Sequence, residues 1–439
     1  MESSTKETAA KELALLEEHW TRLEQDLGID LEDSARTYHA LMRAREIKSG
    51  RDLLRVGAVF GLQDWSYPQI AGWAKLAGIG ELSGPAVRQR LLNMEDWLRF
   101  LISTILKQRC GTLNCQPGWK VRLQDATTVS RPGSTGTDAR LHVEMDLANL
   151  CVTGLQITDA KVGESLAHFE AAADEIRVAD RGHAFASGLG PVLRHGYLVV
   201  RINWQNLPML TATGERLDLI AWLKTLDHPT EISVQLDTPQ GRFPLRLLAS
   251  PLSADKAEAA RRRARRNAEK KHHQVSEGTL LAAGFLLLVS NLPADLWPME
   301  LIFWLYRLRW QIELQFKRYK SLLQLAQLRV LDPTLIQICL LCKMLVILLL
   351  DCLVSQVRLQ QPTWFADPQR PVSLWRLTQL LWAALRNAIY GCITLRRIFA
   401  LLPALESTLR SAPRRRQQQL AWALAVLDQA DPSFSFFVC

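Results

Sequence analysis

The stretch GWKVRLQDATTVSR, residues 118–131, marks a change from helical to strand character along the chain. Its side chains alternate between apolar and polar, and it is rich in β-branched residues, which predicts a half-buried strand. We expect this strand to end at Asp125. An aspartate at a strand end lies at the rim of a sheet, where ligands gather, although a single such aspartate more often only forms a turn.

The residues that follow predict a mixed α/β core. ARLHVEMDLANLCVTGLQITDAK, residues 139–161, predicts two strands joined by a turn near Asn149. We then expect a short helix over 164–175, a strand that ends at Asp180, and another strand over 197–204. Strands followed by alternating helices and strands are typical of an α/β sheet. Asp180 is therefore a second acidic residue at a strand end.

A third acidic residue lies on an amphipathic helix that begins near Pro298. Tyr306, Arg309, Glu313 and Lys320 are spaced by three, four and seven residues, so they share one side of this helix. In isolation such a set is typical of a ladder of surface ion pairs. Apolar residues recur at intervals of three and four and predict a buried face: Ile302, Leu305, Leu308, Ile312, Phe316 and Tyr319.

Two aspartates at strand ends and a glutamate from a nearby helix give three carboxylates that could converge. Converging carboxylates repel one another unless a cation is present. Mg²⁺ prefers oxygen ligands and retains waters, which suits a site that also holds phosphate. Two such ions can activate a nucleophile and stabilise the leaving oxygen of a phosphodiester.

The acidic motifs resemble those of the DDE transposases of bacterial insertion sequences, in particular the "insertion sequence four" group. The signature Y-x2-R-x3-E-x6-K of that group is matched without offset by residues 306, 309, 313 and 320. QDATT and VADRGH resemble the two aspartate motifs, and RLHVEMDL and AKVGES resemble the stretch between them. The resemblance covers about 118–325 well and the flanking helical regions loosely.

Two positions depart from the family pattern. Ala126 follows the first aspartate where the family often has glycine, and His183 stands where an aromatic residue is common. We expect His183 to be a turn or helix-start residue near the site and not a metal ligand, because carboxylates already satisfy Mg²⁺.

The resemblance implies an RNase H-like fold in which Asp125, Asp180 and Glu313 bind two Mg²⁺ ions, which Mn²⁺ can replace. It implies hydrolysis of a phosphodiester at each transposon end, followed by attack of the freed 3′-hydroxyl on target DNA. The tyrosine, arginine and lysine of the signature would hold phosphates. In some relatives an aromatic residue stacks on a flipped base. Trp297 and Phe285 lie in the corresponding region, although core packing is the simpler role for large aromatics.

The charge of the chain favours an anionic partner. Its formal net charge is +9 and its pI is near 9.2, which is compatible with double-stranded DNA. SYPQIAGWAKLAGIGELSGPAVRQRLLN, residues 66–93, predicts a helix-turn-helix with Arg88 and Arg90 on its second helix, and a plain helical hairpin explains it equally well. Further candidate phosphate contacts follow the second aspartate and lie on a basic helix over 256–273: Arg181, Arg262, Arg265, Arg266 and Lys270.

We expect four regions in the chain. Two transposon ends must be brought together, so a homodimer on DNA is expected, with the helices of 370–430 as a candidate dimer surface that core packing explains equally well. The regions are a helical DNA-binding domain over 1–105, a catalytic core over 106–207 and 281–330, a β-rich insertion with the basic helix over 208–280, and a helical domain over 331–439.

Other features exclude further classes of protein. Residues 335–354 are long enough to cross a bilayer, but Gln337, Lys343 and Asp351 interrupt them, which favours a buried core helix. The pairs at 110 and 115 and at 339 and 342 are expected to be structural cysteines and not metal ligands. The acidic, helix-forming start is no signal peptide, so we expect a cytoplasmic protein. A nuclease without strand transfer and an inert DNA-binding protein remain as alternatives.

Overall fold

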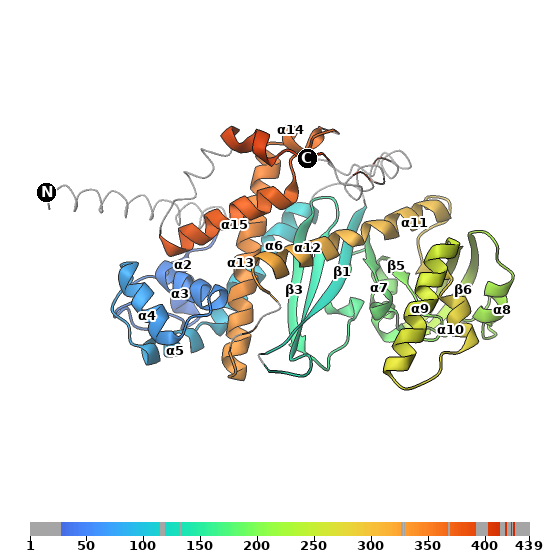
Figure 1. The fold of residues 1–439 in the computed structure, drawn as a ribbon, viewed down its shortest axis with the longest axis horizontal. Helices are drawn as coiled ribbons and strands as arrows, with labels where there is room; N and C mark the ends of the chain where they lie inside the picture. Colours follow the sequence, from blue (N-terminus) through green and yellow to red (C-terminus); the bar gives the residue numbers. More distant parts are fainter. Residues whose placement is uncertain are drawn as a thin grey trace.

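The computed structural model describes residues 28–114, 119–131, 133–325, 328, 330–367, 369–391 and 403–412, and three single positions beyond them. A helical region, a central sheet and an extension of that sheet follow one another along the long axis of the molecule (Figure 1). Cys115, the arginines at 414–416, and parts of the candidate dimer surface over 370–430 lie outside the described residues.

The helical region at one end contains the two helices and the turn predicted over 66–93, an arrangement that fits a helix-turn-helix and a plain helical hairpin equally well. Gly78 and Gly80 form its turn with positive φ, and a Cβ on Gly80 would lie 2.5 Å from the carbonyl oxygen of Glu46. Ser83 caps the second helix and accepts a hydrogen bond from the N–H of Ala86 at 3.3 Å. The helices are α2 (Leu31–Thr37), α3 (Gly50–Leu62), α4 (Tyr67–Leu76), α5 (Gly84–Leu92) and α6 (Glu95–Asn114).

The predicted mixed α/β sheet is confirmed. It has eight strands in the order β3-β2-β1-β4-β5-β8-β7-β6. The first three form an antiparallel meander, β4 and β5 run parallel to β1, and the last three are antiparallel to their neighbours. The strands are β1 (Lys120–Val129), β2 (Ala139–Asp146), β3 (Cys151–Asp159), β4 (Glu175–Ala179), β5 (Tyr197–Arg201), β6 (Thr230–Thr238), β7 (Gly241–Pro251) and β8 (Phe285–Ser290).

The strand that was expected to end at Asp125 continues to Val129. Its parallel pairing with β4 stops at Gln124, opposite Ala179, but its antiparallel pairing with β2 continues past Asp125. Asp125 therefore lies where β1 is paired on one side only. Asp180 follows directly after the last residue of β4, as predicted.

The prediction of a helix over 164–175 is wrong. Only the 3-10 turn η1 (Leu166–His168) forms there, and Phe169 is already extended. The buried Arg177 on β4 explains this, because its guanidinium donates hydrogen bonds to the carbonyl oxygens of Phe169, at 3.0 Å, and of Glu170. A contact from a neighbouring strand thus replaces the helical hydrogen bonds that the local sequence favours.

The chain between β4 and β8 extends the sheet. The hairpin β6–β7 pairs with β8 through β7. Its outer strand, β6, forms an antiparallel bridge between Gln235 and Leu210. Helices cover this part of the sheet at the end opposite α4 and α5 (Figure 1). They are α7 (Ala186–His195), α8 (Leu219–Lys224), α9 (Ala254–Lys270) and α10 (Glu277–Ala282), preceded by the 3-10 turn η2 (Arg181–His183).

The helix expected from Pro298 onwards is divided at Arg309. α11 (Met299–Leu308) packs against β4 and β5, and α12 (Trp310–Leu322) packs against β1. The predicted apolar seam is confirmed, because all six of its residues are buried. These contacts hold Glu313, which lies in the first turn of α12, over the sheet edge near Asp125.

The apolar segment over 335–354 is a core helix, as predicted. It belongs to α13 (Pro333–Gln360), which packs against α3, α6 and β3 and against α15 (Leu374–Tyr390), while the short α14 (Thr363–Ala366) follows it. α13 is the one described helix long and apolar enough to cross a bilayer, and 89% of its most apolar window is buried inside the fold. Cys339 and Cys342 are buried in it.

Asp351, a charged residue in this apolar helix, connects four elements. It accepts hydrogen bonds from Arg109 on α6 at 2.6 Å, from the N–H of Val152 on β3 at 2.9 Å, and from the Gln315 side chain on α12 at 3.2 Å. A buried carboxylate is tolerated only when it is paired in this way. Asp351 therefore joins α13 to the helix that carries Glu313.

We predict that Asp351→Asn lowers the free energy of unfolding by about 3 kcal/mol, because it leaves the Arg109 guanidinium buried without a counter-charge. Urea unfolding of the two proteins measures this difference. Glu95→Gln is the control, because it breaks a partly exposed pair with Arg99 and should cost less than about 1 kcal/mol. Equal destabilisation of the two variants would contradict the prediction.

Candidate active site

Two predicted aspartates come together at one edge of the parallel strands. Gln124 on β1 pairs with Ala179 on β4, so Asp125 and Asp180 are the next residues along two neighbouring parallel strands. Each carboxylate is fixed by the following backbone: the N–H of Ala126 donates to Asp125 at 2.9 Å, and the N–H of Arg181 donates to Asp180 at 2.7 Å. The sheet thus places both oxygen-bearing groups side by side.

Arg309 joins all three predicted acidic residues. Its guanidinium lies 3.5 Å from an oxygen of Asp125 and 3.9 Å from an oxygen of Asp180, and it donates a hydrogen bond to Glu313. The hydroxyl of Tyr306 donates to Asp180 at 3.2 Å. The predicted common side of the helix is therefore correct for these three residues of the signature, and it faces the two aspartates.

Burial and charge act differently on the two aspartates. Burial raises the pKa of Asp125 to about 6; the hydrogen bond from Ala126 and the charge of Arg309 oppose this, while Glu313 contributes to it. Burial also acts on Asp180, but Arg309 and the other neighbouring donors outweigh it and hold its pKa below the ordinary value. Arg309 is thus the counter-ion that keeps part of this acidic cluster ionised.

The chemistry of this cluster suits a hard divalent ion. Three carboxylates from β1, the end of β4 and α12 share one cation, and carboxylate oxygen is the preferred ligand of Mg²⁺ and Mn²⁺. Within the part of the chain that the structure describes, no three histidine, cysteine or acidic side chains are arranged at metal-binding distances in this conformation. The guanidinium of Arg309 lies among the carboxylates instead.

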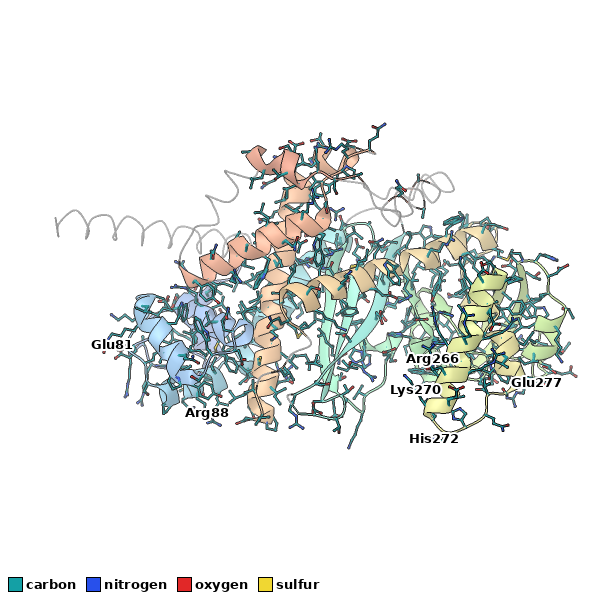
Figure 2. All side chains as sticks on the ribbon, in the orientation of Figure 1. Glu81, Arg88, Arg266, Lys270, His272 and Glu277 are labelled. Carbon is teal, nitrogen blue, oxygen red and sulfur yellow. The ribbon has the colours of Figure 1, made fainter. Side chains whose placement is uncertain are left out.

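Of the remaining predicted phosphate contacts, Arg181 lies next to this cluster, in the turn that begins at Asp180. Lys320 is exposed near the end of α12, and Arg181 is exposed beside Asp180. Arg262, Arg266 and Lys270 are exposed on α9, at the end of the molecule opposite Arg88 (Figure 2). The candidates with partners inside the chain are Arg265, which pairs with Glu258, Arg88, which pairs with Asp332, and Arg90, which donates to the carbonyl of Arg43.

Trp297 packs as a core residue in this structure. Its side chain is 1% exposed, and its ring meets that of Trp119 edge to face at 6.0 Å. Phe285 is half-buried at the start of β8. In this conformation the Trp297 ring has no open face for a base, so stacking would require it to leave the core.

Three further residues lie near the aspartates; the sequence predicted this position for His183 but not for Arg201 or Glu164. Arg201 at the end of β5 lies 3.9 Å from Asp180. His183 is buried in η2, as expected for a turn residue, and its Nδ1 lies 3.9 Å from the carboxylate of Glu164. Glu164 belongs to the AKVGES segment, and only the fold shows that it lies beside the second aspartate motif.

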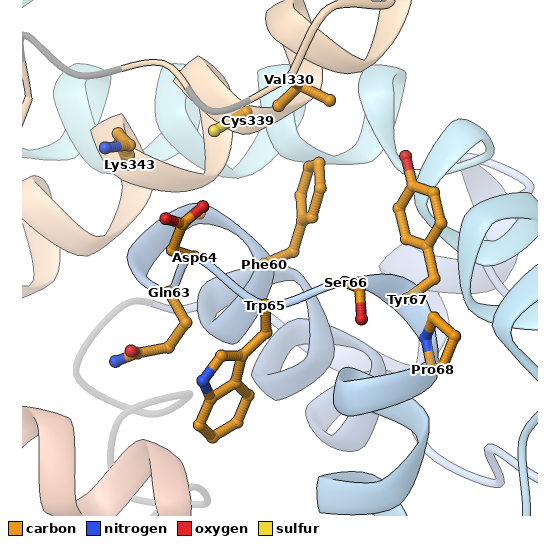
Figure 3. A pocket seen from close by; sticks show the side chains of 11 residues that line it. Phe60, Gln63, Asp64, Trp65, Ser66, Tyr67, Pro68, Val330, Cys339 and Lys343 are labelled. Carbon is orange, nitrogen blue, oxygen red and sulfur yellow. The ribbon is translucent and has the colours of Figure 1, made fainter. Parts of the chain in front are cut away.

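A separate pocket lies between the α3–α4 connection and α13 (Figure 3). Its volume is about 260 Å³, and Trp65, Tyr67 and Lys343 are among the residues that line it. None of the three predicted catalytic carboxylates lines this pocket. It therefore takes no part in the arrangement around Arg309.

We predict that the stability of the metal-free protein falls as the pH rises from about 4 to about 6 because of Asp125. Its pKa is raised from 3.8 to about 6 by folding, so the folded chain retains a proton there that the unfolded chain has released. Asp125→Asn should therefore exceed the wild type in stability by on the order of 2 kcal/mol at pH 7.5 and by almost nothing at pH 4.

Urea unfolding in the presence of a chelator at the two pH values tests this prediction. The exposed Asp295 provides the control, because Asp295→Asn should give the same small difference at both pH values. A difference for Asp125→Asn that does not grow with pH would contradict the assignment.

Comparison with known proteins agrees with this geometry. A family model described as "Transposase DDE domain" matches residues 118–349. The chain is 35% identical over 350 residues to the transposase for insertion sequence element IS421 of Escherichia coli, covering 77% of this chain and 94% of that protein. The InsL protein of element IS186A from Escherichia coli K12 is also 35% identical, over 349 residues and with the same coverage.

A more distant relative is the transposase for insertion sequence element IS231F of Bacillus thuringiensis, 33% identical over 113 residues, which are 26% of this chain and 24% of that protein. The family match agrees with the expected RNase H-like core, and the strands β1 to β5, the two aspartates and Glu313 all lie within it. The chain belongs to the family of transposases that carry a DDE domain.

Proposed function

We propose that this protein is a cut-and-paste DNA transposase, which hydrolyses a phosphodiester at each transposon end and then joins the freed 3′-hydroxyl to target DNA. The single observation that carries this proposal is the contact of one guanidinium, that of Arg309, with Asp125, Asp180 and Glu313. Three carboxylates that converge in this way are suitable ligands for the metal ions of a phosphoryl-transfer site.

Asp125, Asp180 and Glu313 would hold two Mg²⁺ ions, or Mn²⁺ in their place. When bound, these ions supply a positive charge that activates the attacking oxygen and stabilises the leaving one. The residues fit this role because all three are hard oxygen donors on separate, well-packed elements. The parallel strands fix the two aspartates, and the contact of α12 with β1 fixes the glutamate.

Arg309 and Tyr306 prepare the site for a phosphate. Tyr306 is buried and donates to Asp180, which holds that carboxylate in one orientation. Arg309 serves as counter-ion in the metal-free protein, and its planar fork suits bidentate contact with a phosphate next to the scissile bond. Lys320 would add an exposed point charge further along α12.

Double-stranded DNA would bind along the length of the molecule. The helix α9, with Arg266 and Lys270, and the helices α4 and α5 lie at opposite ends of the molecule (Figures 1 and 2). We propose that both contact the terminal repeats, that Arg181 contacts DNA beside the catalytic site, and that two copies assemble on paired ends in the cytoplasm. The four regions predicted from the sequence would divide these tasks between them.

We predict that Glu313→Gln reduces cleavage of a duplex that carries the terminal repeat by at least about a hundredfold, because it removes a charged ligand of the metal site. The binding of the uncleaved duplex should change little. Glu300→Gln is the matched control, since Glu300 is exposed in the first turn of α11 and its variant should cleave at the wild-type rate.

Mapping of nicked and joined products in the presence of Mg²⁺ measures cleavage and strand transfer together. Wild-type cleavage by Glu313→Gln would overturn the catalytic assignment. Cleavage by the wild type without any joined product would instead show a nuclease, and end binding without cleavage would show an inert DNA-binding protein.

We predict that the triple variant Arg262→Ala, Arg266→Ala and Lys270→Ala weakens DNA binding and reduces its dependence on salt. These three residues recur every four positions on one exposed face of α9. Loss of one contact between a basic side chain and a DNA phosphate should reduce the slope of log K against log salt by about 0.9, so loss of three contacts should reduce it by about 2.7.

A gel-shift titration at several salt concentrations measures the slope. Arg242→Ala is the control, because Arg242 is already paired with Asp237 at 2.6 Å on the neighbouring hairpin. An unchanged slope in the triple variant would exclude α9 from the DNA contact.

A further inference from the structure

Glu164 lies directly against the turn that carries Asp180. An added Cβ on Gly182 would be 1.8 Å from the Glu164 carboxylate oxygen Oε2, so this carboxylate occupies the space that the glycine leaves open. The loop that carries Glu164 is fixed, because Leu166 two residues later is fully buried and η1 packs against α7. The close contact is therefore built into the fold.

A buried histidine points toward the same carboxylate. His183 is 2% exposed, its Nδ1 has no hydrogen-bond partner among the described residues, and this atom lies 3.9 Å from Glu164 Oε2. Buried polar atoms in folded proteins are normally paired. A small approach of the two groups would complete a hydrogen bond that orients the Glu164 carboxylate beside the aspartates.

The charge around Glu164 is not balanced by Arg309. The close contacts of that guanidinium in the described structure are with the other three carboxylates, and Glu164 has no ion pair shorter than its contact with His183 there. Burial raises the pKa of Glu164, the charge of Arg140 opposes this, and the charge of Asp180 adds to it; the charge of Glu164 in turn contributes to the raised pKa of Asp125. This side chain is 30% exposed, so water reaches it.

We propose that Glu164 is a fourth acidic residue of the active site, which accepts hydrogen bonds from the water molecules that a divalent ion retains beside Asp180. This inference rests on the proposed function. Mg²⁺ keeps several waters when it binds to protein carboxylates, and groups that orient such outer ligands commonly contribute ten- to a hundredfold to metal affinity. Glu164 is thus a positioning residue, and His183 sets the orientation of its carboxylate.

The test compares Glu164→Gln, which keeps the shape and removes the charge, with the exposed Glu170→Gln from the same loop. Gly182→Ala should displace the Glu164 carboxylate, and Gly163→Ala is its control, since a Cβ on Gly163 would meet nothing within 4 Å. Mn²⁺ binding to the protein without DNA is measured from the electron paramagnetic resonance signal of free Mn²⁺. The Mg²⁺ concentration for half-maximal cleavage is measured in parallel.

We expect Glu164→Gln and Gly182→Ala to weaken Mn²⁺ binding by about tenfold and to raise the Mg²⁺ requirement similarly, with both controls within about twofold of the wild type. Wild-type Mn²⁺ affinity in Glu164→Gln, or a failure of that variant to fold, would overturn the proposal. Asp180→Asn distinguishes a failure of the proposed function from a failure of the role assigned to Glu164. If it leaves Mn²⁺ binding unchanged, the proposed function fails; if it abolishes binding and Glu164→Gln has no effect, this inference alone fails.

Discussion

Mutual repulsion of carboxylates at one edge of the sheet is the constraint on which the rest of the structure depends. Two unit charges 4 Å apart in a partly buried site interact by about 4 kcal/mol, which is comparable to the whole stability of many domains. Arg309 offsets this repulsion for Asp125, Asp180 and Glu313 at once. The position of α12 over β1 is therefore both a packing and an electrostatic requirement.

Buried ion pairs and hydrogen bonds in the rest of the fold fix the position of this sheet edge. β1 and β4 carry two buried arginines, Arg122 and Arg177, whose charges are paired with Asp146, Glu144 and Glu175 on the sheet itself. Asp351 then connects α12 to α6, β3 and α13. A displacement of α12 would break the buried hydrogen bond from Gln315 to Asp351, which therefore opposes movement of Glu313 away from the sheet.

The sequence was sufficient wherever one element decides its own structure. Alternation predicted β1 to β3, the apolar seam predicted the buried face of α11 and α12, and spacing predicted that Tyr306, Arg309 and Glu313 share a side. Prediction from the sequence failed where a residue far away in the chain determines the local structure. Arg177 takes the carbonyls that a helix over 164–175 would need, and pairing with β2 carries β1 beyond Asp125. Glu164 could not be found because its contacts with Gly182 and His183 exist only in the folded chain.

The order of the elements along the chain has a consequence for biosynthesis. α13 is the one described helix that is long and apolar enough to cross a bilayer, and it would be prone to aggregate if it left the ribosome before its partners. Among the described elements that pack against it, α3, α5, α6 and β3 precede it in the sequence and α15 follows it. During N-to-C-terminal translation, a surface for this helix is thus already synthesised when it emerges, and the nascent chain has no need to delay its burial.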